Sequence, residues 1–477
     1  MKRLKYVIAL AAALFIIVSC SNNSNKEKNL TIYHVNDVHG QIKNMAKIKQ
    51  IVDVQKKKNP TILVSAGDMF SGNPVVDNYK DPGYPMIDIM NQTGFSIATL
   101  GNHEFDNGDS ILAIRIAQSN FPWISANADF SKTPIKEVKP YKTITIDGIK
   151  VTFLGLVETG GMQGAVIPST HPWDIKNIDF SRAQDILPNY KNLKSQEKAD
   201  VYIALSHLGH TESPEGMIGD FQLAKVFPYF DAIIGGHTHR RIDTIINGIP
   251  VLQARSYLHY IGKIDLKIGN NKVKVINSEL INLDDYTKTD QLVAKSVDQY
   301  NNEMNAILDQ EIGYSETKLT KTEVGCMFTA ALKDIMKADL CIQNTGGIRS
   351  SLDEGPITIR EIYEIDPFNN GTILYELSIG DLKKFLKESE SGFFYSGLSL
   401  KQKGHEILVY DASDNLLSDS KTIKLGMNDY IAAVHNKFFT GKGYNFSKTS
   451  SQMLIQFFNN SKNNINFSGC NSYFKFE

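Results

Sequence analysis

The sequence has little of the features that mark several specialised protein classes. Its 477 residues include 4 Cys, 15 Pro and 2 Trp, and Gly and Pro together form only about a tenth of the chain, which excludes collagen-like and low-complexity architectures. Lys and Arg (51) balance Asp and Glu (52), so the formal net charge is −1 and no broad positive field exists to bind nucleic acid. The hydrophobic content of 42% is that of ordinary globular domains, and the length predicts two or three of them.

One apolar run stands out, at the N-terminus. Basic residues precede residues 6–18, which have the length of a secretory signal's hydrophobic region and are too short to span a bilayer. Residues 17–20, Ile-Val-Ser-Cys, resemble the lipobox of bacterial lipoproteins. We therefore expect a signal peptide over residues 1–19, a lipid anchor on Cys20, a polar tether over residues 20–29 and a location in the bacterial cell envelope. A plain secretory signal with an incidental cysteine is the alternative.

Three cysteines remain beyond the N-terminus: Cys326, Cys341 and Cys470. Their number is odd, and their spacing is not that of a zinc site. At most one disulfide can form among them. We expect three buried or idle thiols and assign them no function.

Short β-type runs alternate with helical segments in the first part of the chain. Apolar runs bounded by Gly, Asp and Asn predict buried strands over residues 30–35, 61–65, 96–100, 151–157, 201–206, 232–234 and 250–253. This pattern predicts an α/β layered domain over residues 30–285. Apolar residues at helical spacing predict a joining helix within residues 286–312.

A smaller α+β domain is expected over residues 313–477. Its sequence predicts helices over residues 324–336 and 379–387 and strands over residues 338–343, 358–363 and 371–377.

Polar side chains follow five strands of the first domain at their carboxyl ends, the edge at which open α/β sheets bind ligands. Nine of the 11 histidines precede residue 265, which places any metal site in this domain. Zinc or manganese accepts mixed His and carboxylate ligands, and one carboxylate, here Asp68, can bridge two ions about 3.5–4 Å apart. The expected ligands are Asp37, His39, Asp68, Asn102, His207, His237 and His239.

These motifs, Asp-x-His, Gly-Asp, Gly-Asn-His-Glu, His and Gly-His-x-His, together resemble the calcineurin-like metallophosphoesterase signature. Gly-Asn-His-Glu-Phe-Asp over residues 101–106 resembles its 5′-nucleotidase branch. The resemblance implies an α/β/β/α sandwich that holds two divalent ions, zinc or manganese. It assigns one ion to Asp37, His39, Asp68 and His239, and the other to Asp68, Asn102, His207 and His237.

The resemblance also implies roles for residues that are not metal ligands. His103 is expected to be catalytic without binding metal, and Asp106 to orient its ring, because an imidazole needs a partner that fixes its tautomer. Glu104 is expected to be structural. Four further histidines match no motif and are expected to be packed or exposed: His34, His171, His210 and His259.

In the second domain, residues 344–349 resemble the Asn-x-Gly-x-x-Arg segment of the 5′-nucleotidase C-terminal domain. This implies that Asn344 and Arg349 face the substrate, where a guanidinium suits phosphate or ribose oxygens. Phe368 follows a proline as in the family, and Phe438 falls where a second ring would stack on a base.

Two departures from the family weaken the expected nucleoside specificity. Thr320 occupies the place of a family arginine, although a shift of one residue offers Lys321, and Tyr444 replaces the acidic residue that usually holds the ribose hydroxyls. Phosphate hydrolysis is therefore better supported than the choice of nucleoside.

The expected function is a dinuclear metal-dependent phosphohydrolase of the cell envelope that acts on nucleotides. Nucleotide sugars, 2′,3′-cyclic nucleotides, another phosphoester or a thiosulfohydrolase-like reaction are alternatives within the same fold. A lipoprotein that captures nucleotides without catalysis is a further alternative, which the complete ligand set argues against. No obligate protein partner is inferred.

Overall fold

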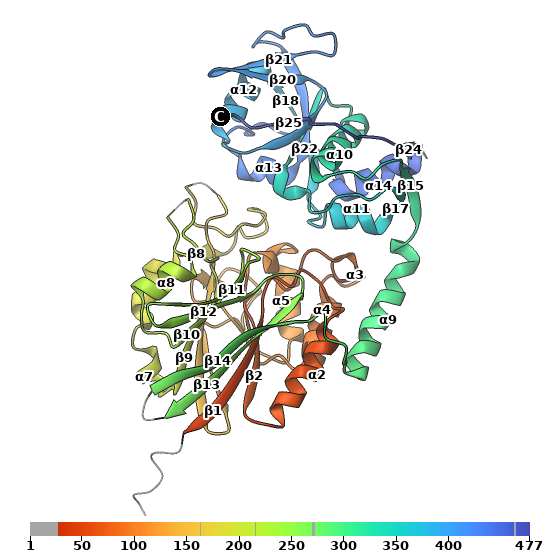
Figure 1. Cartoon of the computed structure of the whole chain (residues 1–477). Coiled ribbons are helices and arrows are strands. Elements are labelled where there is room, and N and C mark those ends of the chain that lie inside the picture. Colours follow the sequence, from red (N-terminus) through yellow and green to blue (C-terminus); the bar gives the residue numbers. More distant parts are fainter. Residues whose placement is uncertain (1–26, 163, 215, 270–271, 462–463) are drawn as a thin grey trace, which may run out of the picture.

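The computed structural model describes residues 27–162, 164–214, 216–269, 272–461 and 464–477. The predicted signal peptide, Cys20 and most of the tether lie outside these ranges. Within them, no helix combines the length and apolar character needed to cross a membrane. Figure 1 shows two bodies, with helix α9 (Gln291–Leu308) running along one side between them.

Both sheets of the first body are mixed. The first has the order β14 (Lys272–Asn282), β13 (Tyr260–Gly269), β1 (Lys28–Val35), β2 (Thr61–Ser65), β3 (Ile97–Thr99) and β4 (Trp123–Ile124). The second has the order β11 (Arg241–Ile246), β12 (Ile249–Ala254), β10 (Ala232–Ile234), β9 (Val201–His207), β7 (Ile149–Val157) and β6 (Tyr141–Ile146). A short pair joins β5 (Ala128–Asp129) to β8 (Asp179–Phe180).

Helices cover the outer face of each sheet, which gives the predicted α/β/β/α sandwich (Figure 1). One side carries α2 (Met45–Lys56), α3 (Pro74–Asp77), α4 (Tyr84–Thr93), η1 (His103–Phe105) and α5 (Gly108–Gln118), and the other carries α6 (Ala183–Ile186), η2 (Leu187–Tyr190), α7 (Leu193–Gln196) and α8 (Asp220–Val226). The inner core is built from alternate residues of both sheets, such as Ile32, Val64, Phe153 and Ile203, as the period of two in a strand requires.

Helix α9 packs on the first body. The Asp290 carboxylate caps it by accepting the N–H groups of Leu292 and Val293. Its buried stripe joins the core beneath α2 and α4, and Tyr300 donates a hydrogen bond of 2.7 Å to Asp88. The joining helix is therefore physically part of the first body.

The second body is the predicted smaller α+β domain. Its main sheet has the order β23 (Tyr444–Thr449), β18 (Gly371–Ser378), β22 (Thr422–Asn428), β16 (Leu340–Asn344), β19 (Phe393–Ser396) and β25 (Tyr473–Phe474). Smaller sheets pair β17 (Gly355–Thr358), β15 (Glu311–Ser315) and β24 (Asn464–Ile465), and β20 (Ser399–Lys403) with β21 (Glu406–Tyr410). One face of the main sheet packs on α10 (Lys321–Met336), α11 (Ile359–Ile365) and α14 (Ser450–Ser461), and the other on α12 (Ile379–Glu388) and α13 (Asp429–Val434). The turn η3 (Thr345–Gly347) follows β16.

One predicted strand is wrong. Residues 359–363 lie in helix α11, and Thr358, the last residue of β17, is its N-cap. Thr358 and Glu361 make a capping box: the Thr358 side chain accepts the Glu361 N–H, and the Glu361 carboxylate accepts the Thr358 N–H. Such reciprocal capping starts a helix where β-branched residues alone favour a strand.

Candidate metal centre and adjoining cavity

The loops that carry the predicted ligands meet at the carboxyl edge of both sheets of the first body. Donor atoms lie within 4.8 Å of one another in three groups: Asp37, His39 and His239; Asp68, His207 and His237; and His39, Asp68 and His103. Asn102 joins the second group, because its Oδ1 lies 3.0 Å from His237 Nδ1. The structure thus brings all seven predicted ligands together.

Most of these ligands have left-handed backbone conformations. The φ angles are 51° at Asp37, 50° at His39, 56° at Asp68, 82° at His237 and 55° at His239. Such conformations cost about 1–3 kcal/mol each and persist where the surroundings fix them, typically at functional sites. Here the ligand loops hold one another, since the Asp37 N–H donates to Gly67 and the His39 N–H donates to Asp68, both at 3.0 Å.

Glycines and one buried carboxylate pack these loops closely. A Cβ at Gly67 would lie 2.6 Å from His207 Nδ1, and one at Gly101 would lie 2.3 Å from Asp68 Oδ1. The Glu104 carboxylate accepts the N–H groups of Asp68 (2.9 Å), Met69 (2.6 Å) and Gly101 (2.5 Å). Glu104 therefore has the structural role expected of it.

Hydrogen bonds orient the imidazoles toward the cluster. His39 Nδ1 donates to the Ser71 carbonyl at 2.9 Å, which leaves its Nε2 unprotonated, 2.9 Å from His239 Nε2. His207 Nδ1 donates to the Ala66 carbonyl at 2.6 Å. His207 Nε2 is buried without a hydrogen-bond partner among the described residues, although it lies 3.0 Å from Asp68 Oδ2. Buried nitrogens that converge with carboxylates in this way fit a divalent cation.

The pKa values of these histidines also favour a divalent cation at the cluster. Burial lowers the pKa values of His39, His237 and His239, the last to about 4, so these rings are neutral with a free lone pair at pH 7. Burial also lowers the pKa of His207, but the carboxylates of Asp68 and Asp37 outweigh it and raise that pKa to about 10. Positive charge is therefore favoured at His207 Nε2, as a proton or as a metal ion in its place.

The amide of Asn102 has a defined orientation. Its Nδ2 donates to the Ser169 carbonyl at 2.9 Å, which turns Oδ1 toward His237. Oxygen is the amide atom that binds metal ions.

His103 and Asp106 form the predicted pair. His103 Nδ1 donates to Asp106 Oδ2 at 2.7 Å, and the other carboxylate oxygen accepts the Thr170 hydroxyl at 2.8 Å. Burial lowers the pKa of His103, but the charges of Asp106 and Asp68 outweigh it and raise the pKa to about 9. The two carboxylates therefore favour the protonated form of the ring.

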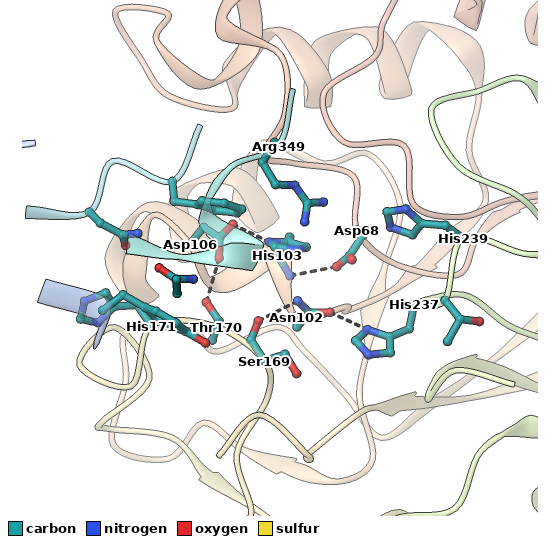
Figure 2. A pocket seen from close by; sticks show the side chains of 16 residues that line it. Asp68, Asn102, His103, Asp106, Ser169, Thr170, His171, His237, His239 and Arg349 are labelled. Atoms are coloured by element: carbon teal, nitrogen blue, oxygen red, sulfur yellow. Dashed lines mark hydrogen bonds and ion pairs between the residues drawn. The ribbon is translucent and has the colours of Figure 1, made fainter. Parts of the chain in front are cut away.

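A cavity of about 440 Å³ joins this cluster to the second body (Figure 2). The predicted substrate residues Asn344, Arg349 and Phe368 all line it. The Phe368 ring stacks on His103 with centroids 5.8 Å apart, and the Arg349 guanidinium lies 5.5 Å from the Phe368 centroid. In Figure 2 the Arg349 side chain extends toward His103 and Asp68.

The second aromatic ring of this cavity, among the described lining residues, is Tyr430 rather than Phe438. Phe438 instead packs against Phe385 at 5.5 Å in the core beneath α12. Tyr430 is the second residue of α13, directly after β22, and no motif in the surrounding sequence identifies it as a cavity residue. Asn370, two residues after Phe368, also lines the cavity and was not predicted.

The four histidines outside the motifs differ in their burial and in their hydrogen-bond partners. His34 is fully buried and neither ring nitrogen has a hydrogen-bond partner in the described structure, His210 contacts Thr238 at 2.8 Å, and His259 pairs with Asp284 at 2.7 Å. His171 differs from the expectation, because it lines the cavity and bonds to Asp429 of the second body at 3.2 Å.

The two departures from the family pattern lie apart from the cavity lining. The Thr320 hydroxyl is used in a capping box with Glu323. Partial burial and the charge of Arg349 lower the pKa of Lys321, so the Lys321 side chain lies close enough to Arg349 to be affected by its charge. Tyr444 is exposed and packs edge-on against Phe446 at 4.8 Å.

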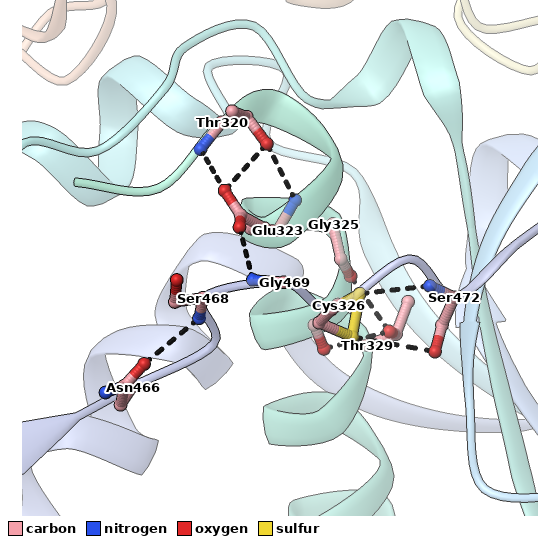
Figure 3. Close-up of a disulfide and its surroundings, with 10 residues drawn as sticks. Thr320, Glu323, Gly325, Cys326, Thr329, Asn466, Ser468, Gly469 and Ser472 are labelled. Carbon is pink, nitrogen blue, oxygen red and sulfur yellow. Dashed lines mark hydrogen bonds between the residues drawn. A yellow bond between two sulfur atoms is a disulfide. The ribbon is translucent and has the colours of Figure 1, made fainter. Parts of the chain in front are cut away.

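The prediction of idle thiols is wrong for two of the three cysteines. Cys326 on α10 forms a disulfide with Cys470 near the C-terminus, across 144 residues of sequence (Figure 3). The Gly469 N–H donates to Glu323 at 2.6 Å, which fixes the same segment on α10. Cys341 is buried and forms no disulfide within the described part of the chain.

Comparison with family models identifies both bodies. Residues 30–241 match the model of the calcineurin-like phosphoesterases, and residues 300–441 match that of the 5′-nucleotidase C-terminal domain.

Curated relatives cover most of the chain. Protein UshA of Yersinia enterocolitica is 25% identical over 86% of each chain, and a 5′-nucleotidase of Vibrio cholerae is 25% identical over 88% of each. The trifunctional nucleotide phosphoesterase YfkN of Bacillus subtilis is 27% identical over 85% of this chain, which spans only 32% of YfkN.

Solved structures share the fold. A 5′-nucleotidase precursor from Thermus thermophilus has a TM-score of 0.75 at 19% identity and matches 91% of this chain and 97% of its own. The sulfate thiohydrolase SoxB of the Thermus genus has a TM-score of 0.71 at 13% identity and matches 91% of this chain and 94% of its own.

Proposed function

The chain belongs to the calcineurin-like phosphoesterases that carry a 5′-nucleotidase C-terminal domain, and from this premise we propose that it removes phosphate from nucleotides with two divalent metal ions. One observation carries the proposal. A single cavity is lined by the metal-binding cluster of the first domain and by an arginine and two aromatic rings of the second. The residues suited to phosphate hydrolysis and the rings suited to stacking on a flat base therefore line the same cavity.

The metal ions have a complete ligand set in this proposal. One group consists of Asp37, His39 and His239, the other of Asn102, His207 and His237, and Asp68 is shared. The mixed nitrogen and oxygen donors suit zinc or manganese. Two such ions supply an activated water and neutralise charge on the phosphoryl oxygens.

His103 acts on the phosphate without binding metal. Asp106 holds its Nδ1 proton, so Nε2 is the nitrogen available to the cavity. With a pKa of about 9, the ring can hold positive charge beside the phosphoryl group or give a proton to the leaving oxygen. Both tasks need an imidazolium.

The second domain binds the rest of the substrate. Arg349 approaches the phosphate or the ribose, and Phe368 and Tyr430 provide faces on which a base stacks. The names of two curated relatives, a 5′-nucleotidase and a trifunctional nucleotide phosphoesterase, support a nucleotide as substrate.

We also propose that the protein is held in the cell envelope by a lipid on Cys20. The support is the apolar run of residues 6–18 followed by the lipobox-like residues 17–20. Labelling with a radioactive fatty acid tests this: wild type incorporates the label, and Cys20→Ala does not.

Phosphate release tests the proposed activity. The chain without residues 1–20 is loaded with manganese or zinc and given AMP, UMP, ADP, UDP-glucose, 2′,3′-cyclic AMP and an aryl phosphate. Preference for nucleoside monophosphates supports the proposal, and turnover of the aryl phosphate alone overturns the assignment to nucleotides. Binding of nucleotides without phosphate release identifies a capture protein instead.

A matched pair of variants tests the base site. Tyr430→Ala is expected to raise KM for AMP about tenfold, because base stacking on an aromatic ring contributes about 1–3 kcal/mol. Phe438→Ala leaves that KM unchanged if Phe438 is a packing residue. If Phe438→Ala raises KM for AMP and Tyr430→Ala does not, Phe438 and not Tyr430 is the residue that stacks on the base.

A further inference from the structure

Three consecutive residues of the first domain contact three different parts of the catalytic apparatus. The Ser169 carbonyl accepts Asn102 Nδ2 at 2.9 Å, the Thr170 hydroxyl donates to Asp106 Oδ1 at 2.8 Å, and His171 Nε2 lies 3.2 Å from Asp429 Oδ1. These partners are a proposed metal ligand, the residue that orients His103, and a residue of the second domain. All three consecutive side chains line the cavity (Figure 2).

Thr170 completes the environment of Asp106. One oxygen of the Asp106 carboxylate accepts His103 Nδ1–H, and the other accepts the Thr170 hydroxyl. A carboxylate held at both oxygens cannot rotate about its Cβ–Cγ bond without losing one of these bonds. Thr170 is almost fully buried, so water does not readily replace its hydroxyl. Thr170 therefore sets the plane of Asp106 and, through it, the direction of the His103 ring.

His171 forms a hydrogen bond with Asp429 of the second domain. Its Nδ1 accepts the Trp173 N–H at 3.3 Å, so the proton lies on Nε2, which donates to Asp429. The neutral ring is sufficient for this bond. The Tyr430 ring lies edge-on to His171 with centroids 5.9 Å apart, and this contact adds to the same junction.

The partner of His171 belongs to the substrate side of the cavity. Asp429 opens helix α13, beside Tyr430, and Asn428 caps that helix. Asn428 also donates to Asn344 Oδ1 at 3.0 Å. The His171 contact thus connects residues 169–171 to helix α13, which carries Tyr430 and is linked through its N-cap Asn428 to Asn344 of β16.

The start of the segment 169–171 is held by a residue outside it, Glu158. The buried Glu158 carboxylate accepts the N–H groups of Gly160 and Ser169, which anchors the point at which Ser169 begins the segment. Each of the three consecutive residues is therefore held by a different partner: Ser169 by Glu158, Thr170 by Asp106 and His171 by Asp429.

We propose that Ser169–His171 is a positioning segment, through which docking of the second domain at Asp429 orients the His103–Asp106 pair. This inference rests on the proposed phosphohydrolase function and deepens it, because it makes the second domain a determinant of turnover and not only of substrate binding. Thr170 and His171 are positioning residues, since they act through Asp106 and Asp429.

The first experiment separates kcat from KM. Thr170→Val removes the hydroxyl at nearly constant volume and is expected to lower kcat for AMP about tenfold with little change in KM, because a hydrogen bond to a charged group is lost. Thr170→Ser restores kcat. A change in KM alone, or failure of the serine variant to restore kcat, overturns the role of Thr170.

The second experiment tests transmission from the other domain. Asp429→Ala is expected to lower kcat about threefold or more, and Thr170→Val with Asp429→Ala to lower it no further than Thr170→Val alone, because both act along one chain of contacts. Asp419→Ala, which removes an exposed carboxylate paired with Lys383, is the matched control and leaves kcat unchanged. Effects that multiply, or a kcat unaffected by Asp429→Ala, overturn the proposal.

Hydrogen exchange provides a readout that needs no turnover. In the protein without added substrate, Asp429→Ala is expected to speed amide exchange in residues 101–106 and 169–171, whereas Asp419→Ala does not. Unchanged exchange in Asp429→Ala refutes the positioning role. Absence of phosphate release from wild type, with the exchange result as expected, instead refutes the proposed function alone.

Discussion

Replacing Glu104 by alanine is expected to loosen the whole metal cluster, although Glu104 is not itself a proposed ligand. Its carboxylate accepts three backbone N–H groups, which belong to Asp68, Met69 and Gly101. A hydrogen bond to a charged group contributes about 1.5–3 kcal/mol, so the loss of three such bonds corresponds to about 4.5–9 kcal/mol. Burial and then the charge of Asp68 raise the pKa of Glu104 to about 7, which places the estimate at the lower end of that range.

The free energy of unfolding in urea measures this loss, and the metal content after dialysis measures its consequence for the site. Glu104→Ala is expected to unfold at lower urea and to lose metal. Glu323→Ala is the matched control, because its carboxylate also accepts backbone N–H groups, from Thr320 and Gly469, but lies at the surface. The control retains its metal. Unchanged stability and metal content in Glu104→Ala would refute the reasoning.

Three further predictions follow from the structure. Asp68→Asn is expected to lose both metal loading and phosphate release, since both donor groups use this carboxylate; elemental analysis beside a phosphate assay checks it, and normal turnover contradicts it. Burial lowers the pKa of His34 to about 3, so its contribution to stability is present above pH 6.5 and falls by about 2 kcal/mol between pH 7 and pH 5; urea unfolding at both pH values should show a smaller decrease for His34→Phe, and an equal decrease refutes the assignment. Replacing Cys326 and Cys470 by serine is expected to cost about 5 kcal/mol by the loop-entropy relation for 144 residues, with the metal content unchanged; equal urea midpoints for wild type and variant contradict this.

The sandwich could be predicted from the sequence because strands that are buried on both faces appear as apolar runs, and polar residues follow these runs at their carboxyl ends. Strands β2 and β10 have the bounds expected from their apolar runs, and His207 proved to be the last residue of β9. Helix α11 was missed because its β-branched start resembles a strand. The signal present there, Thr358 followed three residues later by Glu361, is a capping box, and the same pattern at Thr320 starts α10 three residues before the expected position.

The metal side of the site was easier to foresee than the substrate side. Metal ligands come from short motifs at strand ends, and each motif carries its own chemistry. Tyr430, Asn370 and His171 have ordinary residue types in ordinary surroundings, and only the packing of the two domains brings them to one cavity. The Cys326–Cys470 disulfide likewise depends on a contact across 144 residues that spacing does not reveal.

The central claim is that nucleotide hydrolysis requires two metal ions held by the cluster around Asp68. The most direct measurement is a titration of the metal-free chain, without residues 1–20, with manganese or zinc, in which bound metal and AMP hydrolysis are followed together. The account predicts that turnover is absent without metal and reaches its maximum at two ions per chain. Full turnover in the metal-free protein, or saturation at a single ion, would contradict it.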